Sequence, residues 1–169
     1  MKRRNKSAVA AMARAAMIAA MYVALTYLAS LLGLSSGVIQ FRISEALCIL
    51  PLIFPEAVIG LTLGCALANA LTGALLLDVV FGTLATLIGA LGALAFRKLP
   101  KKVSYLCSVP TILANAIIVP FVLKLVYRLE GGYLFFAATV GLGELVCAGF
   151  LGAYLLFVLR KRVKLYNEN

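Results

Sequence analysis

Residues 37–71 decide the fold and read GVIQFRISEALCILPLIFPEAVIGLTLGCALANAL. Two apolar runs in this stretch are separated only by Pro55 and Glu56, so the chain must reverse direction within about two residues. We therefore expect one helix over 39–54 and a second over 56–71. Both are short beside the roughly 20 residues of a full membrane span, and we expect them to be partly re-entrant or to line a cavity.

The rest of the chain predicts a membrane protein. Of the 169 residues, 64% are apolar and 13% are charged, whereas soluble domains average about 45–50% and about 25%. Four further apolar runs predict helices over 7–32, 78–96, 103–124 and 133–159. Six spans use roughly 120 positions and leave no room for a soluble domain. The sequence thus predicts an all-α integral membrane protein, a six-transmembrane-helix bundle forming a single membrane domain over 1–169.

The basic residues predict the orientation of this bundle, because Lys and Arg in short loops stay on the cytoplasmic side. Thirteen of the sixteen fall on one face of a six-span topology, in clusters at 2–14, 97–102 and 160–164. We therefore predict that both termini are cytoplasmic. An excess of Lys and Arg in so apolar a chain reports orientation, so we expect no nucleic-acid partner. The start resembles a signal peptide, but Arg14 interrupts its apolar run, and we expect a retained first helix.

Polar side chains at membrane depth are costly, roughly 2.5–3.5 kcal/mol each, and so need a reason. In the predicted topology several helices direct such groups toward one space in the outer half of the bundle. This arrangement predicts a ligand-filled or water-filled cavity that is open to the outside. Its candidate substrate-binding residues are Gln40, Arg42, Glu45, Asn69, Asp78, Asn115 and Glu144.

Most of these residues also have a structural interpretation. Arg42 and Glu45 lie three apart on one helical face and can pair with each other. Asp78 suits a helix start as a capping residue, which is the favoured role for it taken alone, and the two asparagines can join helices by hydrogen bonds. Glu144 lies in mid-span with no basic residue within two turns, which favours function. Glu56 is expected to be the first-turn acid of its helix, outside the site.

Small residues on the first helix predict a contact surface. Residues 8–25 read AVAAMARAAMIAAMYVAL, in which Ala15 and Ala19, and likewise Ala16 and Ala20, are four apart. This spacing lets another helix approach closely. From spacing alone, packing within the bundle is the favoured interpretation.

The sequence contains no catalytic pattern. It has no His, which excludes histidine bases and the usual zinc sites. Its four cysteines, at 48, 65, 107 and 147, stand singly in apolar runs and are expected to be buried. It lacks the GxxxxGK[ST] phosphate loop, so it cannot hydrolyse ATP to drive transport. We expect no enzyme, no metal and no cofactor in this chain.

The quoted run 37–71, followed by LLDVVFGTLATLIGAL (76–91) and VGLGELVCAGFLG (140–152), resembles the QueT family of queuosine-precursor transporters. QFRISEAL, LDVVFG and GELV together make this resemblance specific, and it covers nearly the whole chain. It implies a substrate-binding S-component of an energy-coupling factor (ECF) transporter in the bacterial cytoplasmic membrane. Its implied partners are a transmembrane coupling subunit and two cytoplasmic ATPases that hydrolyse ATP.

The resemblance also assigns roles to residues. It implies that the alanine face at Ala15 and Ala19, with Ala16 and Ala20, docks on the coupling subunit. The implied ligand is a 7-deazaguanine, whose ring N–H and amine donors a carboxylate such as Glu144 or Glu45 can accept. Asp78 can neutralise an aminomethyl cation if the ligand carries one. Candidate stacking residues are Phe41, Phe81 and Tyr133.

Two other functions remain open on the sequence. One is an S-component for another small vitamin, because a fold does not decide its substrate. The other is a stand-alone carrier that uses Glu144 as a proton relay.

Overall fold

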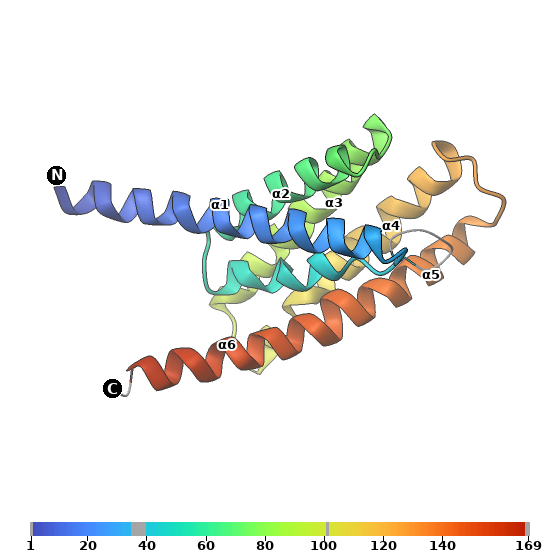
Figure 1. Ribbon diagram of the computed structural model, residues 1–169. Coiled ribbons are helices and arrows are strands. Elements are labelled where there is room, and N and C mark those ends of the chain that lie inside the picture. The colour runs from blue at the N-terminus through green and yellow to red at the C-terminus, as the bar shows by residue number, and fades with distance from the viewer. Residues whose placement is uncertain (1, 35–39, 101, 168–169) are drawn as a thin grey trace.

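The computed structural model describes residues 2–34, 40–100 and 102–167. Its elements, all helical, run side by side between two ends of the molecule, and the chain's two ends lie at the same end (Figure 1). In chain order they are α1 (Lys2–Leu31), η1 (Ile43–Leu52), α2 (Ala57–Leu71), α3 (Leu76–Ala95), η2 (Phe96–Lys98), η3 (Val103–Ser108), α4 (Val109–Leu125), α5 (Tyr133–Glu144), η4 (Leu145–Leu151) and α6 (Gly152–Asn167).

Four of the helical stretches are long and apolar enough to cross a membrane: Ala8–Leu31, Leu76–Lys98, Val103–Leu125 and Tyr133–Arg162. The other two passes are shorter. With a rise of about 2.0 Å per residue in a 3₁₀-helix and about 1.5 Å in an α-helix, η1 and α2 each extend roughly 20 Å, below the roughly 30 Å of hydrocarbon. These two passes lie where the sequence predicted incomplete spans.

η1 differs from the α-helix expected over 39–54. It is a 3₁₀-helix that begins at Ile43, while Ile39 lies outside the described residues. Pro51 inside it offers a reason, because proline lacks the N–H of an α-turn and its ring clashes with the carbonyl four residues earlier. Every residue from Ser44 to Pro51 is buried, so η1 is a central element against which α1, α2, α3 and α6 pack.

The last helix predicted, over 133–159, is continuous but not uniform. α5 ends at Glu144, residues 145–151 form the π-helix η4, and α6 continues to Asn167. A π-helical stretch inside a helix is rare and is often found at functional sites. It follows directly on the residue that the sequence singles out in mid-span.

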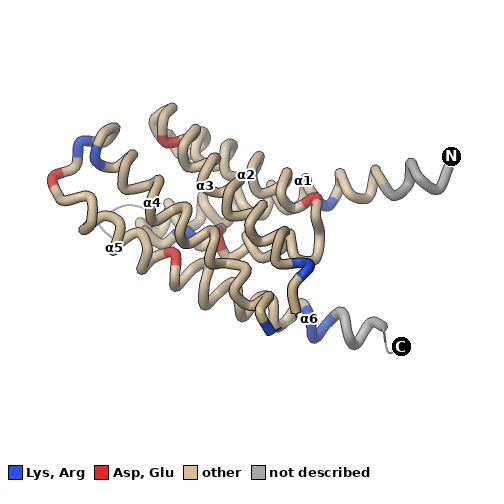
Figure 2. Tube along the Cα trace, turned by 180° about the vertical axis from the view of Figure 1, so that it is seen from behind, with Lys and Arg blue, Asp and Glu red and all other residues tan. Residues whose placement is uncertain are grey.

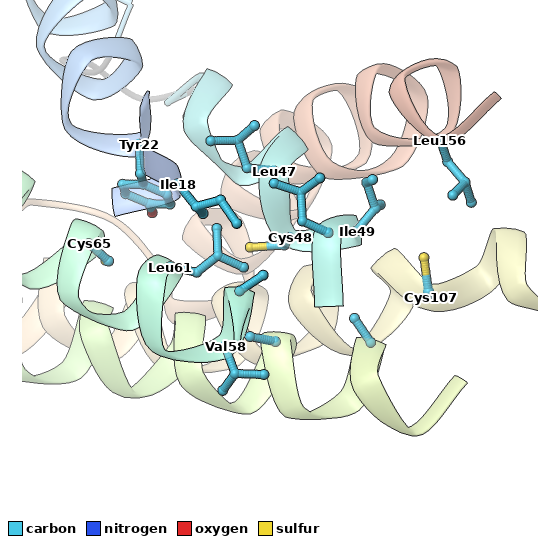
Figure 3. Close-up of a cluster of buried hydrophobic side chains, with 14 of the residues drawn as sticks. Ile18, Tyr22, Leu47, Cys48, Ile49, Val58, Leu61, Cys65, Cys107 and Leu156 are labelled. Carbon is cyan, nitrogen blue, oxygen red and sulfur yellow. The ribbon is translucent and has the colours of Figure 1, made fainter. Parts of the chain in front are cut away.

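The main core lies around η1 (Figure 3). Tyr22 from α1, Ile49 from η1, Leu61 from α2 and Leu156 from α6 are all fully or almost fully buried in it. The four cysteines are buried and free, as expected. A smaller cluster of Val119, Leu123, Phe136 and Val140 joins α4 to α5 nearer the other end.

α1 and α2 pack backbone to backbone through glycines. A Cβ on Gly64 would lie 3.0 Å from the Cα of Ala19, and one on Gly60 would meet the carbonyl oxygen of Ala15. Ala15 and Ala19 are accordingly half-buried against α2. Ala16 and Ala20 are exposed on the other side of the helix. The alanine face predicted from spacing is therefore divided between an internal and an external surface.

Positive charge gathers at the end of the bundle that holds the termini (Figure 2). Arg14 there pairs with Glu56 at the start of α2 and lies over the ring of Phe54. The described basic residues at the opposite end are Lys124, in the last turn of α4, and Arg128, in the loop that follows it, while Arg42 is half-buried directly before η1. The described side chains thus show the asymmetry that the sequence predicts.

Candidate binding site

A cavity of about 590 Å³ opens at the end of the bundle away from the termini. The C-terminal ends of α1, α2 and α4, the starts of α3 and α5, and the segment before η1 form its walls. Its aromatic lining residues are Phe41, Tyr127, Phe135 and Phe136. A volume of this size falls within the range typical of small-molecule sites.

Four of the predicted site residues line this cavity: Gln40, Arg42, Asn69 and Asp78. The other three, Glu45, Asn115 and Glu144, do not line it and are at most 1% exposed. They lie deeper in the bundle, Glu45 on η1, Asn115 on α4 and Glu144 at the end of α5. The structure thus divides the predicted site into a lining layer and a buried polar layer.

Arg42 is the cation of the lining layer. Its Nη2 donates to Asn69 Oδ1 at 3.2 Å and lies 3.8 Å from Cys65 Sγ. No carboxylate of the described residues forms a salt bridge with it, so the Arg42–Glu45 pair that the spacing left open is not formed. Because a guanidinium carries five N–H donors, Nη1 and Nε keep donors for an acceptor in the cavity.

Glu45 is occupied by protein donors. Its Oε1 accepts hydrogen bonds from the hydroxyls of Tyr22 on α1 and Thr86 on α3, the latter at 3.1 Å. Its Oε2 accepts from the thiol of Cys48 at 2.9 Å. Glu45 therefore joins α1, η1 and α3 behind the cavity.

Glu144 and Asn115 differ from Glu45 because each has an acceptor that no described group satisfies. Glu144 Oε2 and Asn115 Oδ1 are buried without a hydrogen-bond partner, while Asn115 Nδ2 donates to the carbonyl of Thr111 on its own helix. Val119 and Val140 pack together across the antiparallel helices α4 and α5, and each of the two residues lies one turn deeper. Each of these two unsatisfied buried acceptors calls for a donor.

The mouth of the cavity is bridged by Tyr127, from the loop between α4 and α5. Its hydroxyl donates to Asp78 at 2.9 Å and accepts from the N–H of Leu75 at 3.4 Å. Burial and the hydrogen bond to Asp78 raise the Tyr127 pKa above its usual value of 10.0, so the phenol keeps its proton at neutral pH. Asp78 lies in the first turn of α3, whose N-cap position is Leu75, so it does not act as the expected cap.

Sequence reasoning missed several residues of the site. Glu130 and Tyr127 line the mouth, and Tyr22 and Thr86 hold Glu45. Of these four residues, only Thr86 could have been inferred from the sequence, because it lies eight residues after Asp78 and hence on the same face of α3. Of the predicted stacking residues Phe41 lines the cavity. The other two do not: the hydroxyl of Tyr133 donates to the carbonyl of Ile117 at 2.7 Å, and Phe81 packs against Phe121.

These features define a class: a small helical membrane protein with a polar, aromatic-lined cavity near one end of its bundle. Comparison with known proteins then identifies the family. The family model described as QueT transporter matches residues 12–161. A queuosine precursor transporter, QueT of Lactococcus lactis subsp. cremoris (strain MG1363), is 32% identical over 157 residues, which cover 89% of this chain and 92% of the relative. No solved structure matches.

The chain therefore belongs to the QueT transporter family, and the resemblance inferred from its motifs is confirmed. It is a multi-pass protein of the bacterial plasma membrane.

Proposed function

We propose that this chain captures a queuosine precursor, a 7-deazaguanine, from outside the cell as the S-component of an ECF importer. The observation that carries this proposal is the cavity itself, with Arg42 and Asn69 on one wall and four aromatic side chains around them. A flat ring with one acceptor edge and one donor edge suits such a lining. The name of the Lactococcus relative supports the choice of ligand.

Recognition would use both polar layers. Arg42 offers two N–H donors to the ring carbonyl, whose oxygen can accept both, because a 7-deazaguanine has carbon in place of the N7 acceptor that guanidinium groups contact in guanine. Gln40 and Asn69 line the same cavity and add amide groups. Glu144 would accept the donor edge, because its Oε2 has no hydrogen-bond partner among the described residues. For this contact the ligand must pass below the level of Arg42, into the buried polar layer.

The proposal also includes the way in which the chain crosses the membrane. All six helical passes cross the membrane, η1 and α2 as short passes that other helices shield from lipid in part. Both termini are cytoplasmic, which agrees with the basic residues gathered at that end of the bundle. The cavity, at the opposite end, then opens to the outside.

Delivery would need partners, because the chain has no nucleotide-binding motif of its own. We assign docking on the coupling subunit to α1, where Ala16 and Ala20 are exposed. Ala15 and Ala19 would act indirectly, because they set the distance between α1 and α2. ATP would be hydrolysed by the two partner ATPases.

The deciding experiment is native purification with mass spectrometry of both the bound small molecule and the copurifying proteins. We expect a 7-deazaguanine together with a coupling subunit and ATPases. A different vitamin would refute the substrate while keeping the S-component role. A chain that transports in proteoliposomes with no ATPase present would instead be a stand-alone carrier.

A further inference from the structure

One face of α3 runs from the mouth of the cavity to the buried polar layer. Asp78, Gly82 and Thr86 follow one another at intervals of four residues and so share that face. Asp78 lines the mouth, and Thr86 donates to Glu45 at depth. Gly82, between them, lies level with the Arg42–Asn69 hydrogen bond.

The space beside Gly82 is filled by these two polar side chains. A Cβ on this glycine would lie 2.9 Å from Asn69 Nδ2, closer than such atoms approach in proteins. It would lie 3.7 and 3.8 Å from Arg42 Nη2 and Nη1, which are ordinary contact distances. A methyl group here would therefore displace the amide of Asn69 first and leave room for the guanidinium.

The amide has little freedom to move while keeping its bond. Asn69 is 6% exposed, and its Nδ2 is already in contact with Cys65 Sγ at 3.5 Å. Its Oδ1 is 3.2 Å from Arg42 Nη2, near the upper end of the usual N–H···O range. A shift of a few tenths of an ångström is thus enough to break the bond between Asn69 and Arg42.

We infer that Gly82 is a positioning residue of the binding site, which holds Asn69 within hydrogen-bonding distance of Arg42 by having no side chain. The inference rests on the proposed function, because Arg42 is the residue expected to recognise the acceptor edge of the ligand. Among the described glycines of α3, Gly89 and Gly92 instead face Thr111 and Pro110 of α4. Those two glycines serve helix packing, whereas Gly82 serves the site.

The first test is Gly82→Ala in the full chain, purified in detergent. Binding of 7-aminomethyl-7-deazaguanine and 7-cyano-7-deazaguanine is measured by calorimetry. We expect the dissociation constants to rise about 10- to 150-fold, the loss of one hydrogen bond to a charged group. The matched control is Gly141→Ala, whose Cβ would lie 3.6 Å from Ala116 Cβ and should change nothing. Unchanged binding by Gly82→Ala overturns the inference.

A double-mutant cycle separates positioning from packing. If Gly82 acts through the amide, Gly82→Ala should weaken binding less than about twofold in an Asn69→Ala background. Penalties that multiply in the double variant would mean a packing effect and would overturn the inference.

A measurement that needs no ligand tests the role of Gly82 separately from the proposed function. Arg42 modification by phenylglyoxal, followed by peptide mass spectrometry, should be several-fold faster in Gly82→Ala than in the parent chain, because the guanidinium has lost its acceptor. An unchanged rate overturns the inference whatever the ligand. If the parent chain binds neither 7-deazaguanine, the proposed substrate fails, while the reaction rate still decides the role of Gly82.

Discussion

Replacing Arg42 with Lys separates the geometry of the site from its charge. Lys keeps a positive charge near Glu45 and Glu144, but it replaces a planar fork of donors with a single ammonium group. The bond from Nη2 to Asn69 Oδ1, at 3.2 Å, and the paired contact proposed for the ligand both depend on that fork. Arg42→Lys should therefore weaken binding while the buried carboxylates keep their counter-charge.

The magnitude follows from the bond that is lost. One hydrogen bond to a charged group contributes about 1.5–3 kcal/mol, so the dissociation constant should rise roughly 10- to 150-fold. Arg42→Gln is the matched comparison, because it removes the charge as well. Two buried carboxylates then remain without a cation, and losing one partner of a buried charge arrangement is strongly destabilising. Its melting temperature should fall well below that of Arg42→Lys.

The assay is calorimetric titration of a 7-deazaguanine into each purified variant, with melting curves recorded on the same samples. Parent-like affinity in Arg42→Lys would refute the paired contact. Equal melting temperatures for the two variants would refute the role of Arg42 in balancing the buried carboxylates.

Three further outcomes follow from the structure. Glu144→Gln should bind about 10- to 100-fold more weakly, because it replaces an acceptor oxygen with an amide donor that faces the ligand's own donors; a lower melting point with normal affinity would make Glu144 structural. Leu at both Ala16 and Ala20 should abolish uptake in cells while the purified variant still binds ligand, and loss of binding as well would show that this face belongs to the bundle. A reporter fused after Asn169 should be active only in the cytoplasm, and activity outside would invert the topology and the cavity with it.

The sequence predicted where helices run better than how they are built. The run at 78–96 corresponds to α3 at Leu76–Ala95, because its apolar residues are bounded by clear breakers. The 3₁₀ geometry of η1 was not predicted, since an apolar run of that length fits either helix type. The π-helix after Glu144 was not predicted either, because it changes the rotation per residue without changing the composition.

The site was predictable as a set of polar residues but not as a set of contacts. The predicted topology placed Gln40, Arg42, Asn69 and Asp78 near one end of the bundle, and all four line one cavity. They could be singled out because polar side chains are costly at membrane depth. Periodicity says which face of a helix a residue occupies but not its partner on another helix. For that reason the hydroxyl of Tyr22, 23 positions away, could not be predicted as a partner of Glu45.

Because residues 145–151 are π-helical, the last helix contains one residue more than a regular α-helix would need to direct the same side chains inward. Glu144 and Leu156 both face the interior, at 1% and 0% exposure, although twelve residues of a regular α-helix make three and a third turns and would leave them about 120° apart. The slower rotation of the wider turns absorbs this difference. Eleven residues make almost three whole turns, so a chain shortened by one residue at lipid-facing Phe150, which is 69% exposed, keeps both side chains inward as plain α-helix. A second deletion would rotate Leu156 out of the core by about 100°. The number of residues that this segment can lose is therefore limited by the direction of its side chains and not by the distance that the helix must span.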